Sequence, residues 1–99
     1  MLHLTPDELK IIKDILQAYP YTFYVFGSRL KGTAKKFSDL DLCYKDLISD
    51  ETIGNLREQF EESDLPFKVD FLSWQRCLPE FQILIAPELV DIKTFIKTN

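Results

Sequence analysis

Helical patterns alternate with short apolar runs along this sequence, and that alternation limits its fold more than any other feature. Apolar residues recur at helical spacing between residues 9 and 16, whereas residues 21–26 are β-branched and aromatic, which is typical of a buried strand. The chain has 99 residues, enough for one hydrophobic core but not for two. We therefore expect a single domain over residues 1–99, of the α/β (α+β) class, with a small mixed sheet and flanking helices.

Start and stop signals place the expected elements. Thr5 and Glu8 are spaced as a capping box, so a helix is expected from there to about residue 18. Ser49 is the expected N-cap of a second long helix, which ends before Pro66. The other expected elements are a strand at residues 21–26, a short helix at 28–30, strands at 39–44 and 69–72, a helix at 79–85 and a short edge strand at 89–92.

Composition excludes several classes of function. No apolar stretch approaches the ~20 residues that cross a bilayer, and the first residues lack the segments of a signal peptide, so we expect a cytoplasmic protein with no membrane partner. Cys43 and Cys77 lack metal-binding spacing and are expected to be reduced, and Cys77 and Trp74 are expected to be packing residues. The net charge of −4 argues against a long nucleic acid as partner, although a single nucleotide remains compatible.

Two acids on one expected strand are the first candidates for chemistry. Asp39 and Asp41 are separated by Leu40, and strand side chains alternate, so both carboxylates are expected on one face, about 6.6 Å apart. Such a pair repels itself unless a cation or hydrogen bonds lie between the two groups. Mg²⁺ is the simplest compensation, since it binds one or two carboxylates together with substrate phosphates.

Two further features surround this pair in the sequence. Gly27 and Ser28 lie between an expected strand and a short helix, where glycine lets the backbone approach a ligand and helix N–H groups can bind a phosphate. Asp70 lies within the apolar strand at residues 69–72, where an unpaired charge is costly, and it completes a triad if that strand neighbours the one at 39–44. Each feature is common by itself, but their order along the chain is specific.

The basic residues near these motifs have simpler interpretations. Arg29 could contact a phosphate or form a structural ion pair with a nearby acid, and we favour the structural role. Lys31, Lys35 and Lys36 are expected to be solvated surface residues, as exposed lysines usually are. His3, the one histidine, is expected in a frayed terminus, which argues against a histidine base or a histidine-ligated metal.

Residues 26–32 (FGSRLKG) and 38–42 (SDLDL) resemble the motifs of minimal nucleotidyltransferases of the DNA polymerase beta superfamily. The resemblance covers about two-thirds of the chain, through Asp70, with no visible departure from the core pattern. It implies a polymerase-beta-like fold and a site with two Mg²⁺ ions. The site residues that it implies are, for the nucleotide, Gly27, Ser28, Arg29 and Ser38, and, for catalysis and metal binding, Asp39, Asp41 and Asp70.

The same resemblance implies an enzyme that transfers a nucleoside monophosphate, AMP from ATP, to an acceptor hydroxyl. The acceptor would be a tyrosine of a HEPN-type toxin (higher eukaryotes and prokaryotes nucleotide-binding) in a hetero-oligomer, with this chain as antitoxin. The alternative is a non-catalytic module that caps its partner, because thirteen aromatic residues could include an exposed contact patch. Transfer to tRNA or antibiotics is ranked last, because it requires a further domain to bind the acceptor.

Overall fold

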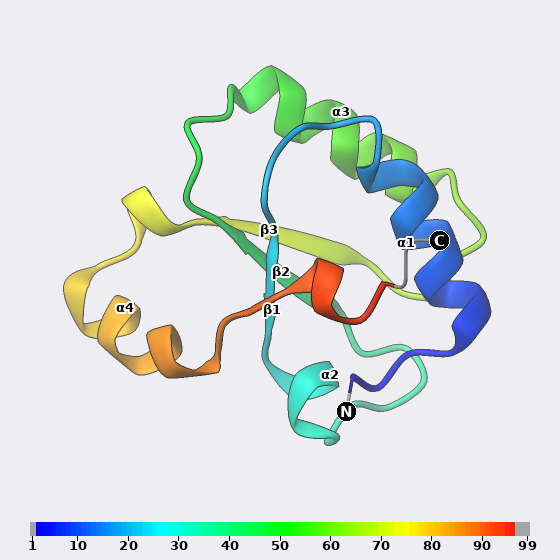
Figure 1. Cartoon of the computed structure of the whole chain (residues 1–99), viewed down its shortest axis with the longest axis horizontal. Helices are drawn as coiled ribbons and strands as arrows, with labels where there is room; N and C mark the ends of the chain where they lie inside the picture. The colour runs from blue at the N-terminus through cyan, green and yellow to red at the C-terminus, as the bar shows by residue number, and fades with distance from the viewer. Residues whose placement is uncertain (1, 97–99) are drawn as a thin grey trace.

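The computed structural model describes residues 2–96, which form a four-stranded mixed sheet with helices packed against it (Figure 1). In chain order the elements are α1 (Pro6–Leu16), β1 (Tyr24–Phe26), α2 (Ser28–Lys31), β2 (Leu40–Tyr44), α3 (Asp50–Glu61), β3 (Val69–Ser73), η1 (Trp74–Arg76), α4 (Pro79–Ile85), η2 (Ala86–Glu88), β4 (Val90–Asp91) and η3 (Ile92–Thr94), where η denotes a 3₁₀ turn. The expected order of elements and the mixed α+β class are both confirmed. In this part of the chain, no helix has the length and apolar character that crossing a bilayer requires.

The strand order of the sheet is β3-β2-β1-β4. β1 runs antiparallel to β2 and β4, whereas β2 and β3 are parallel and are joined through α3, because parallel strands need a long connection. Phe26 pairs with Asp41, and Asp41 pairs with Asp70, across three neighbouring strands. The end of β1 and the starts of β2 and β3 therefore lie at the same end of the sheet, where the strands terminate.

The hydrophobic core lies between the sheet and the helices α1 and α3, which pack against each other (Figure 1). Ile12 of α1 and Leu56 of α3 are completely buried against the sheet. The Phe23 ring makes edge-on contacts with the rings of Tyr44 and Phe71, at centroid distances of 6.4 Å and 5.6 Å. Fully burying one side chain of this size contributes about 1.5–3 kcal/mol, so this core is a main source of stability.

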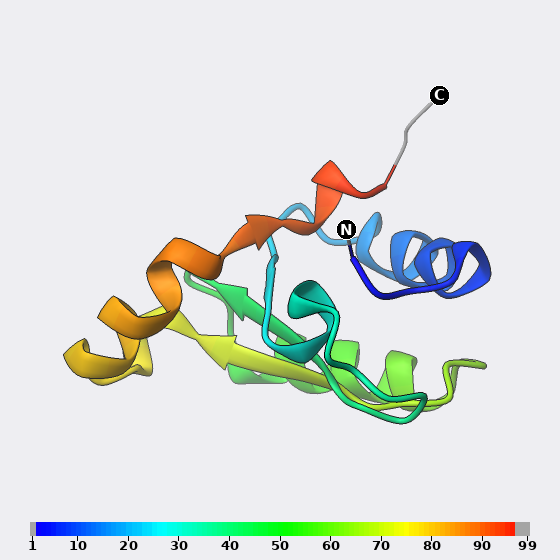
Figure 2. The same ribbon diagram turned by 90° about the horizontal axis from the view of Figure 1, so that it is seen from below.

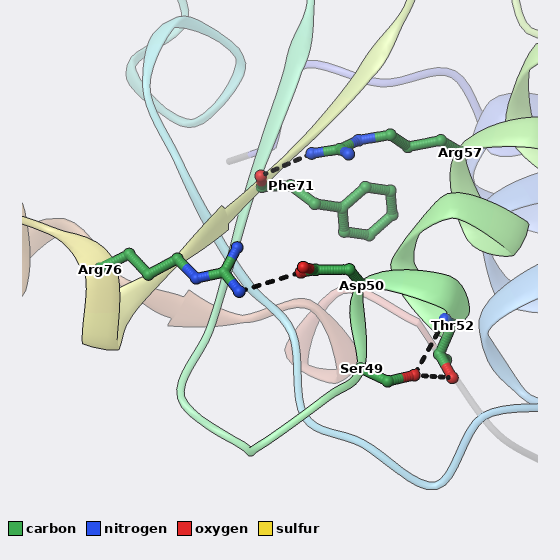
Figure 3. A network of polar contacts seen from close by, with 6 residues as sticks. All are labelled: Ser49, Asp50, Thr52, Arg57, Phe71 and Arg76. Carbon is green, nitrogen blue, oxygen red and sulfur yellow. Dashed lines mark hydrogen bonds and ion pairs between the residues drawn. The ribbon is translucent and has the colours of Figure 1, made fainter.

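Polar contacts fasten α3 to the neighbouring β3 segment (Figure 3). Ser49 Oγ accepts a hydrogen bond of 3.1 Å from the amide three residues later, which confirms the expected N-cap. Asp50 in the first turn forms an ion pair of 3.0 Å with Arg76 of η1. Further along the helix, Arg57 reaches β3 and donates a hydrogen bond of 3.4 Å to the Phe71 carbonyl oxygen. The contacts of Asp50 and Arg57 fix the helix relative to β3 and η1.

Two local expectations differ from the structure. The strand expected over residues 21–26 begins only at Tyr24, because the Thr22 amide donates a hydrogen bond to Asp46 Oδ2 (3.0 Å) in a neighbouring loop. The expectation that His3 lies in a frayed terminus is wrong. Its amide donates to the Arg29 carbonyl oxygen (2.7 Å), and its own carbonyl accepts from Arg29 Nη1 (2.9 Å). The segment before α1 is therefore attached to α2.

The helix α4 lies apart from α1 and α3, beyond the end of β3 (Figures 1 and 2). Ile85 at its end is buried and attaches the helix to the rest of the molecule. Ile83 and Leu84 are 76% and 66% exposed, so much of the apolar surface of this helix is open. Trp74 and Cys77, which the sequence predicts to be packing residues, lie in the segment that connects β3 to α4, and both are half-buried.

Candidate active site

Three carboxylates meet where β2 and β3 begin. Asp41 and Asp70 are direct partners in the parallel register. Leu40 and Leu42, on either side of Asp41, are completely buried, so the Asp41 side chain points away from the core as expected. Asp39 immediately precedes β2, and its side chain lies close enough to Asp70 to raise the pKa of that carboxyl. The structure therefore brings together all three acids that the sequence singled out.

The repulsion among these acids affects their ionisation. Partial burial raises the pKa of Asp41 above its ordinary value, and the negative charges of Asp70 and Asp39 raise it further. The pKa of Asp70 is also raised, first by partial burial and then by the hydrogen bond and charge of Asp39, while Lys68 and Arg57 act in the opposite direction. Ionising the whole cluster is therefore unfavourable unless positive charge is added.

Gly27 joins β1 to α2 beside Asp41. Its backbone has φ 84° and ψ −157°, a combination that glycine alone adopts without strain. A Cβ atom at this position would lie 2.5 Å from Asp41 Oδ2, closer than nonbonded atoms can approach. Ser28 then begins α2, and the first N–H groups of a helix have no partner within the helix. The turn expected to bind phosphate is therefore adjacent to the acid cluster.

The donor set at this site fits a hard divalent cation. All three acids offer carboxylate oxygens, which Mg²⁺ prefers, and a cation would relieve the repulsion that raises the pKa of Asp41. Within residues 2–96, no three acidic, histidine or cysteine side chains already enclose a metal-sized position. Mg²⁺ usually takes one or two carboxylates with water and substrate phosphates, so a site that closes when nucleotide binds agrees with its chemistry. The number of ions stays a prediction.

Arg29 of α2 is almost completely buried, with 3% of its surface exposed. Its guanidinium donates hydrogen bonds to four backbone carbonyl oxygens. These acceptors belong to Ser38 (2.9 and 3.1 Å), His3 (2.9 Å), Lys36 (3.1 Å) and Lys35 (3.3 Å). Arg29 therefore has the structural role that the sequence favoured, but its partners are carbonyl groups and not a nearby acid. The sequence missed these partners because any residue supplies a backbone carbonyl. Nucleotide contact by Arg29 stays a prediction.

Contacts around Arg29 also attach both acid-bearing segments to α2. The guanidinium carbon lies 3.8 Å from the centroid of the Phe67 ring, in the segment that leads into β3 and Asp70. Ser38 Oγ accepts a hydrogen bond of 2.8 Å from the amide three residues earlier, which closes the loop that leads into Asp39. Nucleotide contact by Ser38 stays a prediction. In this structure its hydroxyl and carbonyl both hold the loop.

A cavity of about 520 Å³ opens beside the acids, next to the edge strand β3. Asp39 and Asp70 contribute to its wall, together with the basic residues Arg57 and Lys68. Phe37 also lines it and is 66% exposed. The last three residues escape sequence-based prediction because they come from different segments and belong to no motif. The one signal for Phe37 is its position two residues before Asp39.

Comparisons by sequence identify related proteins. The profile of the family described as "Polymerase beta, Nucleotidyltransferase" matches residues 10–92 of this chain. The chain is also similar to a protein of Haemophilus influenzae named "Probable protein adenylyltransferase MntA". The two are 43% identical, over 98% of this chain and 89% of that protein.

Solved structures share the fold. A crystal structure described as "the toxin-antitoxin with AMP-PNP" has a TM-score of 0.64 and 19% identity, covering 85% of this chain and 71% of that chain. A crystal structure of "the toxin-antitoxin MntA-HepT" has a TM-score of 0.55 and 16% identity, covering 85% and 68%. At these identities the likeness concerns the fold alone, and it agrees with the expected polymerase-beta-like topology.

Proposed function

The chain belongs to the polymerase beta nucleotidyltransferase family, and we propose that it transfers AMP from ATP to a tyrosine hydroxyl of a HEPN-type toxin, with Mg²⁺ as cofactor. One observation carries the proposal. Asp41 and Asp70 are register partners, Asp39 lies beside Asp70 in the wall of the same cavity, and Gly27 lies next to Asp41. A phosphate-binding turn adjacent to clustered carboxylates suits nucleotidyl transfer, because the triphosphate and the acceptor hydroxyl must meet at one point.

Each site residue has a role in the proposed reaction. Gly27 and Ser28 would hold the triphosphate, and Asp39, Asp41 and Asp70 would hold two Mg²⁺ ions. Bound Mg²⁺ would neutralise charge on the entering and leaving oxygens of an in-line displacement. Asp70 accepts the proton of the acceptor hydroxyl, whose oxygen bonds to the α-phosphorus of ATP. The bond from the α-phosphorus to the bridging oxygen breaks, and pyrophosphate leaves with the electron pair.

The acceptor and the partner are proposed from the related proteins. The Haemophilus protein is named a probable protein adenylyltransferase, and two solved structures of the same fold are toxin–antitoxin complexes, one of them with AMP-PNP. These names support ATP as the nucleotide and a toxin protein as the acceptor, held in a hetero-oligomer with this chain as the antitoxin. We also propose a cytoplasmic location, because Cys43 and Cys77 are both free thiols.

The transfer can be measured with ATP labelled at its α-phosphate, Mg²⁺ and a purified HEPN-type toxin. Label should reach a tyrosine of the toxin. Asp39→Asn or Asp41→Asn should slow transfer by about a hundredfold or more while the melting temperature is maintained. Leu47→Ser is the control, because Leu47 is 90% exposed and follows the opposite end of β2. Undiminished transfer by a variant with both aspartates replaced would refute the metal and catalytic assignment.

A second candidate is a non-catalytic antitoxin that caps its partner. The open apolar surface of α4 favours it, since Ile83 and Leu84 are 76% and 66% exposed and such surfaces often mark protein contacts. The intact acid cluster opposes it, because clustered carboxylates without a catalytic role reduce stability. The two candidates differ in whether toxin neutralisation depends on the acids.

A further inference from the structure

The order of the site residues across the sheet indicates the side from which the acceptor approaches. Gly27 follows β1, Asp41 lies on β2, and Asp70 lies on β3, which is the edge strand. With the triphosphate at the end of β1, the free approach to Asp70 is from beyond the edge of the sheet. The cavity of about 520 Å³ lies on that side, with Asp39 and Asp70 in its wall.

The rest of this cavity is lined by aromatic and basic side chains, by the acidic Glu61 and by smaller apolar residues. Phe67 is buried and lines it, whereas Phe37 is 66% exposed, so packing in the core does not account for this ring. Arg57 reaches from α3 toward β3 (Figure 3), and Lys68 immediately precedes β3. Both positive charges act on Asp70. The cavity therefore presents an open aromatic surface and two cations beside a catalytic carboxylate.

We propose that this cavity is the acceptor subsite, and that it binds the side chain of a tyrosine on the substrate protein with Phe37 as the main contact. The inference rests on the proposed function, because it states where the acceptor of that reaction binds. The volume lies within the range of about 300–1,000 Å³ that is typical of ligand pockets. A tyrosine ring can pack against Phe37, edge-on or offset, with its hydroxyl directed to Asp70. Serine or threonine would leave the aromatic surface without a partner.

The chemistry of the transfer explains the basic residues. As the phenolic O–H bond breaks, its proton passes to Asp70, and the oxygen forms a bond to the α-phosphorus of ATP. Pyrophosphate leaves with the electrons of the broken P–O bond. Negative charge develops on the phenolic oxygen before the new bond is complete, and Arg57 and Lys68 stabilise that charge.

Substituting the exposed ring tests the subsite. Phe37→Ser should raise the KM for the toxin about tenfold, because truncating one aromatic contact in an interface often has that effect. The Kd for a non-hydrolysable ATP analogue should stay within about twofold, since Phe37 lies on the acceptor side. Phe37→Tyr should retain the parent KM because the aromatic contact is kept. Leu47→Ser is the control, because it replaces an exposed apolar residue remote from the acids, and it should leave both constants unchanged.

The outcomes separate this inference from the proposed function. If Phe37→Ser transfers AMP with an unchanged KM for the toxin, the acceptor-subsite proposal is refuted. The proposed transferase function would not be affected by that result. A fall in melting temperature, or a Kd for the ATP analogue raised as much as the KM, would make Phe37 a structural residue and also remove the subsite. A parent protein that transfers no AMP to the toxin would overturn both proposals.

Discussion

Among single residues, a comparison of the three glycines of the chain distinguishes the effect of backbone strain from the effect of contact with a neighbouring side chain. Gly27 has a positive φ of 84°, and a Cβ atom there would meet Asp41 Oδ2. Gly32 has a similar φ of 78° but open space around it, and Gly54 lies in α3 with open space as well. Gly27 is thus the one position where both the conformation and the neighbouring acid require glycine.

Gly27→Ala should therefore damage both stability and activity. The strained backbone should lower the free energy of unfolding by about 1–3 kcal/mol, and the displaced Asp41 carboxylate should slow AMP transfer by about tenfold or more. Gly32→Ala should lose similar stability but keep its transfer rate, and Gly54→Ala should gain up to about 1 kcal/mol. Urea unfolding and the labelled-ATP assay measure these effects. Equal transfer by the Gly27 and Gly32 variants would show that the contact with Asp41 has no importance.

Asp41→Asn should stabilise the metal-free protein at neutral pH. The folded state raises the pKa of this carboxyl above 3.8, so the penalty for ionising it appears as the pH rises through the folded pKa. Below the ordinary pKa both states hold the proton and the penalty vanishes. We expect a gain of less than about 1 kcal/mol near pH 7, since the side chain is half-exposed and screened, and none near pH 3. Urea unfolding in chelator at both pH values tests this. Destabilisation near pH 7 would instead mark the carboxylate as structural.

At the scale of elements, α2 shows which contacts a sequence can predict. The caps of α1 and α3 are visible in the sequence because each capping side chain binds an amide three residues away. α2 has four residues and is too short to be stable alone. It is held by Arg29, whose acceptors are backbone carbonyl groups in the loop at residues 35–38 and at His3. Carbonyl groups have no residue signature, so an ion pair with an acid was suggested for Arg29 instead.

Arg29→Lys should lower the free energy of unfolding by about 2–3 kcal/mol. A lysine ammonium cannot reach all the carbonyl oxygens that the planar guanidinium binds, and it loses the stacking on Phe67. Arg76→Lys is the matched control, because Arg76 forms an exposed ion pair with Asp50 and should lose less than about 1 kcal/mol. Hydrogen–deuterium exchange of residues 35–38 should increase in the Arg29 variant alone. If the two variants lose the same stability, the structural role assigned to Arg29 is contradicted.

Across the fold, the strand order explains why Asp70 lies at an open edge of the sheet. β3 has β2 on one side only, so Asp70 is bounded by Asp41 on that side and by the cavity on the other. The sequence predicts that Asp39 and Asp41 lie together, because they are two residues apart at the start of one strand. It left the pairing of β2 with β3 open, since short apolar strands do not specify their neighbours. The cavity was not predictable, because Phe37 and Arg57 meet there only through the tertiary fold.

Asp70→Asn should separate catalysis from binding in the complete toxin–antitoxin assembly. Asp70 is exposed and the change is nearly isosteric, so the core and the open apolar surface of α4 should persist. The variant should therefore still co-purify with the toxin, yet transfer AMP about a hundredfold more slowly, because the group that receives the acceptor proton is lost. Cells that express the toxin should then lose protection, as measured by growth and by mass spectrometry of the toxin. Asp14→Asn, at an exposed aspartate of α1, is the control and should protect fully. If the Asp70 variant protects cells as well as that control, neutralisation occurs by binding alone, and the capping interpretation replaces the enzymatic one.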